Sequence, residues 1–209
     1  MKKKKINDQV MLKTLNFLYD KTVKGFPKTK TAEDLAKSYM VKYEDVKEAA
    51  SKLVNGQLVK SGSSGLATGF PGILVFPIAL STDVLASLYI QIRMVAALAY
   101  IGGYDIETEE VKAITYMCLC GDSAKDIAKD FGLDIEGQNL EQYIKEFPRD
   151  LVNKLNKAVV VNLLTTFIQN GALNFSKLIP VIGGFVGAGI DVLKTKEIGK
   201  VAIEMFILK

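Results

Sequence analysis

One long stretch of the chain, residues 65–105, is almost free of charge and limits what the chain can fold into. Only Asp83 and Arg93 interrupt it before Asp105 closes it. Residues 81–102, between a Ser-Thr pair and two glycines, are typical of one helix about 20 residues and roughly 30 Å long. A helix of this length either crosses a bilayer or forms the centre of a small domain.

Arg93 stands at the middle of this helix and favours the second alternative. An arginine that faces lipid there costs about 2.5–3.5 kcal/mol. On a helical wheel Arg93 lies close to Ala86, Ile90 and Ala97, and small side chains on one face predict a closely packed neighbouring helix. We therefore expect a compact, all-α, multi-helix domain around the helix at 81–102, with Arg93 pointing into protein.

A buried guanidinium requires a carboxylate partner. Asp83 is about 15 Å from Arg93 along the same helix, which is too far. Asp191 or Asp105 is the expected partner, and Asp191 is favoured because Asp105 would have to fold back about 15 Å along the helix. These four residues, Asp83, Arg93, Asp105 and Asp191, form the candidate polar cluster. The alternative is an arginine at a helix contact whose head group reaches water.

Two glycine-rich segments, 61–72 and 178–191, are the next constraint. The first lacks the Gly-Lys-Ser/Thr ending and the preceding strand of a phosphate-binding loop. The second contains G-x-x-x-G, which packs helices in lipid and marks close backbone approach in a soluble core. We expect close-packing or membrane-facing roles for six glycines: Gly65, Gly69, Gly72, Gly183, Gly184 and Gly187.

The chain contains no histidine and two cysteines, Cys118 and Cys120. The lack of histidine excludes Ser-His-Asp and Cys-His catalysis and every histidine-ligated metal site. The cysteines are too close in sequence for an unstrained disulfide, which favours a reducing cytoplasmic setting. The first residues, MKKKK, lack the apolar region of a signal peptide. We predict no catalytic residue, cofactor or metal site.

Positive charge is concentrated at the N-terminus. Residues 1–30 carry nine lysines against Asp8 and Asp20, a net charge of +7, and the whole chain has +4. Such an arm suits an anionic surface, and Lys2, Lys3, Lys4 and Lys5 are its expected contacts. The alternative is a solvated lysine tail. We expect residues 1–60 to form a basic helical segment packed on a core of residues 61–209, together one domain.

Within the N-terminal segment, a first helix is expected at 6–22, and Gly25 ends it. Two short helices follow, the first capped by Thr31 and the second running from Tyr43 to Asn55–Gly56. Helix, turn and helix resemble a DNA-binding motif, but acidic residues occupy the second helix where a recognition helix carries Arg, Asn or Gln. We therefore expect no nucleic-acid partner.

After Asp105 the pattern remains helical. Helices are expected to start at caps Thr108, Ser123 and Asn139. Pro148 opens a further helix of about 22 residues, whose polar positions favour a buried bundle helix over a lipid-exposed span.

From about Thr31 to Phe206 the chain resembles the EcsC domain family. The matching pieces are G-L-A-T-G-F-P-G at 65–72, F-P…L-S-T-D ending at Asp83, Arg93 with A-Y-I-G-G-Y-D at 99–105, L-I-P-V-I-G-G-F-V-G-A-G-I-D at 178–191 and G-K-V-A at 199–202. The resemblance implies a bacterial, cytoplasmic, membrane-facing accessory protein related to one encoded beside an ABC transporter, and it implies no reaction. Members often have asparagine where this chain has Asp191.

Three functions fit these features. The first is a non-enzymatic cytoplasmic protein that associates peripherally with the inner face of the membrane. The second is a soluble partner-binding regulator of a membrane transporter. The third is a carboxylate-based hydrolase, which requires Asp83, Asp105 and Asp191 to meet near Arg93 and could bind Mg²⁺. The sequence does not indicate an oligomeric state.

Overall fold

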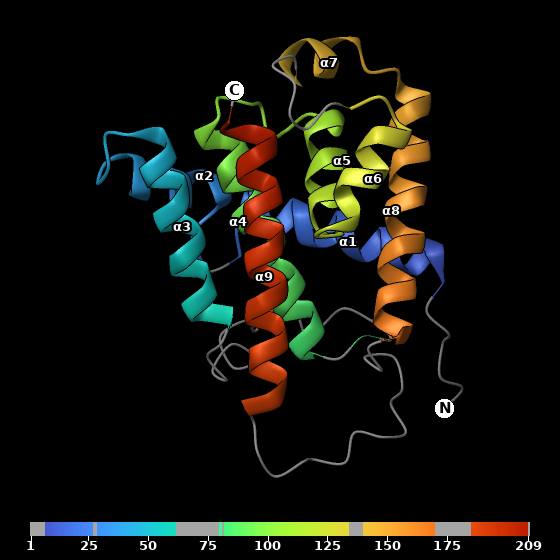
Figure 1. Ribbon diagram of the computed structural model, residues 1–209, viewed down its shortest axis with the longest axis horizontal. Helices are drawn as coiled ribbons and strands as arrows, with labels where there is room; N and C mark the ends of the chain where they lie inside the picture. The colour runs from blue at the N-terminus through green and yellow to red at the C-terminus, as the bar shows by residue number, and fades with distance from the viewer. Residues whose placement is uncertain are drawn as a thin grey trace.

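The computed structural model describes residues 7–26, 29–61, 80, 82–133, 140–169 and 185–208, with the side chains of 60–61, 168–169 and 185–191 left out. These residues form nine helices and no strand, so the all-α prediction is confirmed (Figure 1). The helices are α1 (Asp8–Lys24), α2 (Ala32–Met40), α3 (Val46–Ser61), α4 (Thr82–Ile101), α5 (Glu109–Cys118), α6 (Ser123–Asp130), α7 (Leu140–Glu146), α8 (Arg149–Gln169) and α9 (Phe185–Phe206).

Helix α4 is unbroken and central, as predicted, and contacts α1, α2, α3, α5 and α9. Ala86, Ile90 and Ala97 are at most 2% exposed. Of the described helices, α4 is the one long and apolar enough to cross a membrane, with a mean hydropathy of 1.7, but 83% of that window is buried inside the protein. It ends at Gly102 and Gly103, and Gly103 adopts φ 85°. Because protein surrounds it, α4 is a core helix here.

The caps of α1 and α2 follow from local sequence. Asn7 accepts the backbone N–H of Val10, and Gly25, at φ 87°, ends α1. At the start of α2, Thr31 and Asp34 form the expected capping box, in which each side chain accepts the other residue's backbone N–H. These caps fix where both helices begin.

Helix α3 is longer than expected. The prediction that it stops at Asn55–Gly56 is wrong, because the helix continues through Gly56 to Ser61. The hydroxyl of Tyr39 on α2 occupies the place where a Cβ at position 56 would project. Gly56 therefore allows two helices to approach closely, and it does not end one.

Two more glycines bring α9 against its neighbours. A Cβ on Gly199 would lie 2.6 Å from Cγ1 of Val54 on α3. A Cβ on Gly102 would collide with the backbone carbonyl oxygen of Phe206 near the end of α9. As a result α9 packs against both α3 and α4 (Figure 1).

The second half of the chain completes the bundle. Thr108 caps α5 as predicted. Ser123 is the first residue of α6, whose N-cap residue is Asp122, without a side-chain hydrogen bond, so the predicted Ser123 cap is wrong. Helix α8 follows Pro148 as expected and packs against α5 and α1.

Candidate functional site

Arg93 is buried, as predicted, at 7% exposure. Its Nη1 donates to the backbone oxygen of Lys30 and its Nη2 to Oε1 of Gln57, each at 3.4 Å. The guanidinium carbon lies 5.3 Å from the centre of the Tyr89 ring. Nε of Arg93 finds no hydrogen-bond acceptor in the part of the chain that the structure describes. Neutral oxygens and an aromatic face therefore surround this cation, at long distances for hydrogen bonds.

Asp105 is not the partner of Arg93, so that alternative is wrong. Asp105 is exposed, and its carboxylate accepts the backbone N–H of Glu107 at 2.9 Å. Helix α4 continues for eight residues, or about 12 Å, from Arg93 to its end at Ile101, and Asp105 lies beyond that end. The hydrogen bonds of the Arg93 guanidinium go instead to Lys30 and Gln57. The pairing with Asp191 stays a prediction, since that side chain lies outside the described residues.

Asp83 is exposed at the other end of α4. It lines a small cavity of about 100 Å³ with Ser87, Gln91 and Lys194. In this cavity Nε2 of Gln91 donates to Oγ1 of Thr195 at 3.2 Å, which links α4 to α9. Asp83 and Asp105 are separated by about 30 Å of helix. The structure therefore does not bring these two acids together as the hydrolase hypothesis requires.

Several predicted site residues lie outside the description. They are Lys2, Lys3, Lys4 and Lys5, and Gly65, Gly69, Gly72, Gly183 and Gly184. Gly187 is within α9, but its surroundings are not among the described contacts. The close-packing glycines that the structure does show are Gly56, Gly102 and Gly199.

One end of the molecule gathers four helix termini. Helices α3 and α8 end there, and α4 and α9 begin there, at the lower end in Figure 1. The chain joins these termini through residues 62–81, which carry no charge, and residues 170–184, which carry only Lys177. Two exposed apolar side chains stand on the helices nearby, Val59 at 75% and Leu193 at 64% exposure. We call this region the helix-terminus end.

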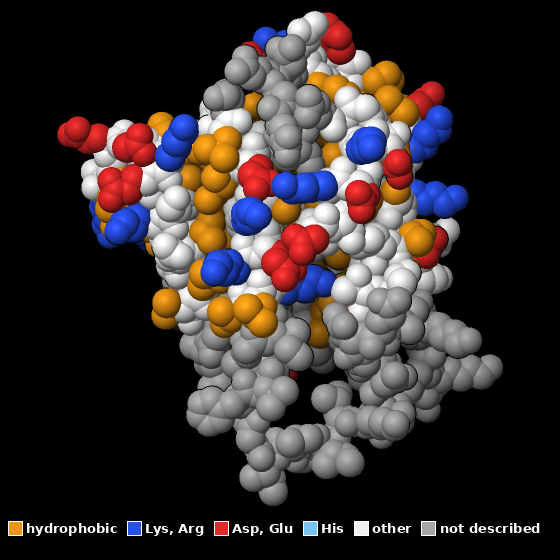
Figure 2. Space-filling model, in the orientation of Figure 1, with side chains coloured by type: hydrophobic (Ala, Val, Ile, Leu, Met, Phe, Trp, Pro, Cys, Tyr) orange, Lys and Arg blue, Asp and Glu red, His pale blue; other side chains and the backbone are white. Residues whose placement is uncertain are grey.

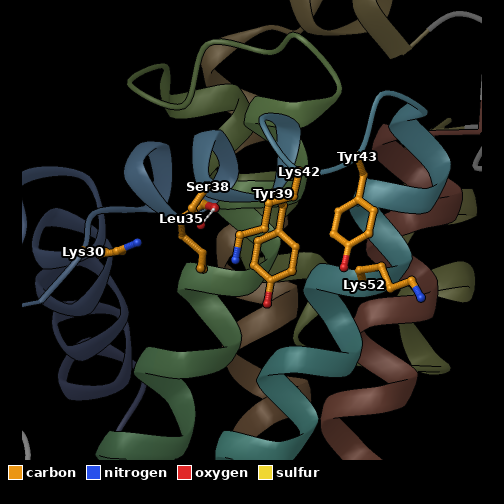
Figure 3. Close-up of a pocket in the computed structure, with 7 residues that line it drawn as sticks. All are labelled: Lys30, Leu35, Ser38, Tyr39, Lys42, Tyr43 and Lys52. Carbon is orange, nitrogen blue, oxygen red and sulfur yellow. Dashed lines mark hydrogen bonds between the residues drawn. The ribbon is translucent and has the colours of Figure 1, made fainter.

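A second cavity of about 350 Å³ lies between α2 and α3, away from that end (Figure 3). Tyr39 and Tyr43 stack there with ring centres 6.4 Å apart, and Nζ of Lys52 lies 5.8 Å from the Tyr43 ring. Lys30, Lys42, Leu35 and Ser38 complete the lining. Sequence reasoning missed this cavity. The available signal was the pair of tyrosines four residues apart with a lysine between them.

Elsewhere on the face shown in Figure 2, lysines and acids are intermixed. Glu204 on α9, for example, pairs with Lys125 at 2.9 Å and with Lys200 at 3.9 Å. Cys118 and Cys120 are buried and unlinked. Burial raises the pKa of the Cys118 thiol far above its usual range and that of Cys120 to about 12. Neither thiol is therefore a nucleophile near neutral pH.

Comparison with known proteins identifies the family to which the sequence is related. The sequence model of the EcsC protein family matches residues 3–208. No match was found among curated proteins or among solved structures. The match covers nearly the whole chain, which therefore belongs to the EcsC family. It extends the sequence resemblance, drawn from Thr31 to Phe206, into the first helix.

Proposed function

We propose that this EcsC family member is an accessory protein that binds the surface of an anionic membrane through its helix-terminus end. The observation that carries the proposal is the meeting of four helix termini at one end, where two nearly uncharged segments join them. Apolar side chains that insert into the bilayer interface are removed from water, and this burial stabilises the bound state.

The described residues near this end support the proposal. Val59 stands in the last turn of α3, and Leu193 stands in the first half of α9. Helices α3 and α9 are neighbours, because Gly199 of α9 packs against Val54 of α3. Both side chains are apolar and exposed on helices that have a terminus at this end. We infer that they contact the bilayer together with this end of the molecule.

The N-terminal lysines supply the electrostatic part of the proposal. A lysine near an anionic bilayer contributes about 1 kcal/mol of attraction, which salt screens. Lys2, Lys3, Lys4 and Lys5 precede α1, whose first residue is Asp8. The proposed function combines this attraction with apolar contact and requires no reaction. Reversible binding at a cytoplasmic membrane face follows from it.

Vesicle co-sedimentation tests the proposal. The protein should pellet with vesicles that contain phosphatidylglycerol, and less so at high salt. Deleting Lys2–Lys5 should weaken binding at least about tenfold. Val59→Glu with Leu193→Glu should weaken it further, because two carboxylates replace apolar contact.

Val41→Glu is the matched control. Val41 is 88% exposed and follows α2, away from the helix-terminus end. This substitution should leave vesicle binding unchanged. No pelleting with anionic vesicles, or equal effects of Val41→Glu and the double change, would contradict the proposal. The result would then favour a soluble regulator that docks on a membrane-protein partner.

A further inference from the structure

The cavity between α2 and α3 has an unusual charge balance. Three lysines line it, Lys30, Lys42 and Lys52, and no acid does. None of the three forms an ion pair with a carboxylate among the described residues, whereas lysines such as Lys24, Lys37 and Lys145 do. Positive charge without a compensating acid attracts an anion.

Three of the nearby acids are already engaged, and Glu44 and Glu48 do not line the cavity. Glu33 forms an ion pair with Lys37 and accepts a hydrogen bond from the hydroxyl of Tyr100. Asp34 accepts the backbone N–H of Thr31 in the capping box. Asp45 accepts the backbone N–H of Glu48 at the start of α3. Each carboxylate holds a helix start or an exposed lysine, and none of them lies in the cavity lining.

The cation of Arg93 adds to the field from inside. Its Nη1 donates to the backbone oxygen of Lys30, so the guanidinium lies directly behind one lining residue. No described carboxylate neutralises it, and it is 7% exposed. A buried charge is screened less than the exposed lysines are.

Packing between α2 and α3 fixes the position of Tyr39 in the cavity wall. Tyr39 packs into the space that Gly56 leaves on α3, and its ring stacks on Tyr43. Figure 3 shows the Lys30 side chain directed toward Leu35, the Lys42 ammonium group beside Tyr39, and the Tyr43 hydroxyl next to Lys52 of α3. Burial raises the pKa of Tyr39, so its hydroxyl remains a proton donor.

We propose that this cavity binds the phosphate group of a phosphomonoester, with Lys30 and Lys42 as its cationic contacts and the Tyr39 hydroxyl as a further donor. Ammonium groups and a hydroxyl are donors that phosphate oxygens accept. The organic part of the ligand packs on the stacked tyrosine rings. A cavity of about 350 Å³ accommodates a small metabolite.

The ligand has two chemical sources, a soluble phosphate ester or the headgroup of phosphatidic acid. The helix-terminus end lies beyond Ser61, where α3 ends. Lys42, a proposed contact, precedes the start of α3, and Lys52, which lines the cavity from α3, is nine residues or about 14 Å of helix before Ser61. This separation from the helix-terminus end favours the soluble ester. This inference does not depend on the proposed function.

Isothermal titration calorimetry of the full chain with glycerol 3-phosphate and with AMP tests the soluble source. Saturable binding is expected, and Lys42→Gln and Lys30→Gln should each weaken it about ten- to a hundredfold. Lys145→Gln, an exposed lysine on α7, is the matched control and should leave binding unchanged. Thermal melts verify that each variant folds, as expected for exposed side chains.

Vesicles that contain phosphatidic acid test the other source. Binding that Lys42→Gln weakens and Lys145→Gln does not supports the site and assigns the ligand as a headgroup. If neither glycerol 3-phosphate, AMP nor these vesicles bind in a Lys42-dependent manner, the proposal is overturned. Phosphatidylglycerol vesicles, which present a phosphodiester, should bind equally to both variants, which separates this test from that of the proposed function.

Discussion

The contact between Gly199 of α9 and Val54 of α3 predicts that the effect of Gly199→Ala on stability depends on the side chain at position 54. A Cβ on Gly199 would lie 2.6 Å from Cγ1, 3.0 Å from Cγ2 and 3.4 Å from Cβ of Val54. Overpacking of this kind costs about 1–3 kcal/mol. Alanine is a better helix former than glycine by about 0.8–1.0 kcal/mol, which offsets part of the cost. We therefore expect Gly199→Ala alone to be neutral or to destabilise the protein by up to about 2 kcal/mol.

In a Val54→Ala background, the effect of Gly199→Ala on stability should change sign. Val54→Ala deletes both Cγ atoms of a side chain that is 7% exposed and should itself cost about 2 kcal/mol. What remains is the Val54 Cβ, 3.4 Å from the new methyl group, which is ordinary contact. In the Val54→Ala background, Gly199→Ala should therefore stabilise the protein by about 1 kcal/mol, through helix propensity and a partly filled cavity.

Urea denaturation of the four proteins, followed by circular dichroism, measures this double-mutant cycle. The coupling energy should be about 1–3 kcal/mol and favourable. For a chain of this size, each kcal/mol corresponds to about 2–4 °C in Tm. If Gly199→Ala destabilises equally in both backgrounds, Val54 is not the obstacle and the packing of α9 on α3 is described incorrectly.

Three further predictions concern the core and the caps. Arg93→Met should lower the free energy of unfolding by about 3–5 kcal/mol if Arg93 has the predicted buried partner Asp191, and a change of less than about 1.5 kcal/mol would contradict that pairing. Thr31→Ala should cost about 1 kcal/mol in a thermal melt by removing the capping box of α2, and an unchanged Tm would contradict that role. The free energy of unfolding should fall as pH rises from about 7.5 toward 12, because folding raises the pKa values of Cys118 and Cys120, so that the unfolded chain loses its thiol protons first. Equal urea midpoints at pH 7.5 and pH 10 would contradict this raised pKa.

Features set by neighbouring residues could be predicted from the sequence. The central helix follows from a long run without charges, and its end follows from Gly102 and Gly103. The capping box of α2 follows from Thr31 and Asp34, three residues apart. In each case the physical cause lies within one or two helical turns, so the order of residues is sufficient to find it.

Features set by contacts between residues distant in sequence could not be predicted from the sequence. Gly56 has the local pattern of a helix end, yet α3 continues because Tyr39 packs against it from another helix. A glycine inside a helix costs about 1 kcal/mol relative to alanine. The presence of Gly199 inside a helix therefore indicates a close contact, which the sequence analysis did not predict.

The candidate site shows the same division. The burial of Arg93 was predictable from its place on an apolar helix. Its described partners were not, since a backbone oxygen of Lys30 and the amide of Gln57 carry no charge pattern that a sequence reveals. Likewise, Lys30 and Lys52 meet in one cavity only because α2 and α3 fold against each other.

Labels at opposite ends of α4 test whether the helix-terminus end meets the membrane. Asp83 and Asp105 are both exposed and about 30 Å apart. Asp83→Cys and Asp105→Cys can each be labelled with a fluorophore, because the native thiols are buried and protonated. With vesicles that contain phosphatidylglycerol and nitroxide-labelled lipid, we predict strong quenching at position 83 and little at position 105. Equal quenching at the two positions, or stronger quenching at 105, would contradict the claim.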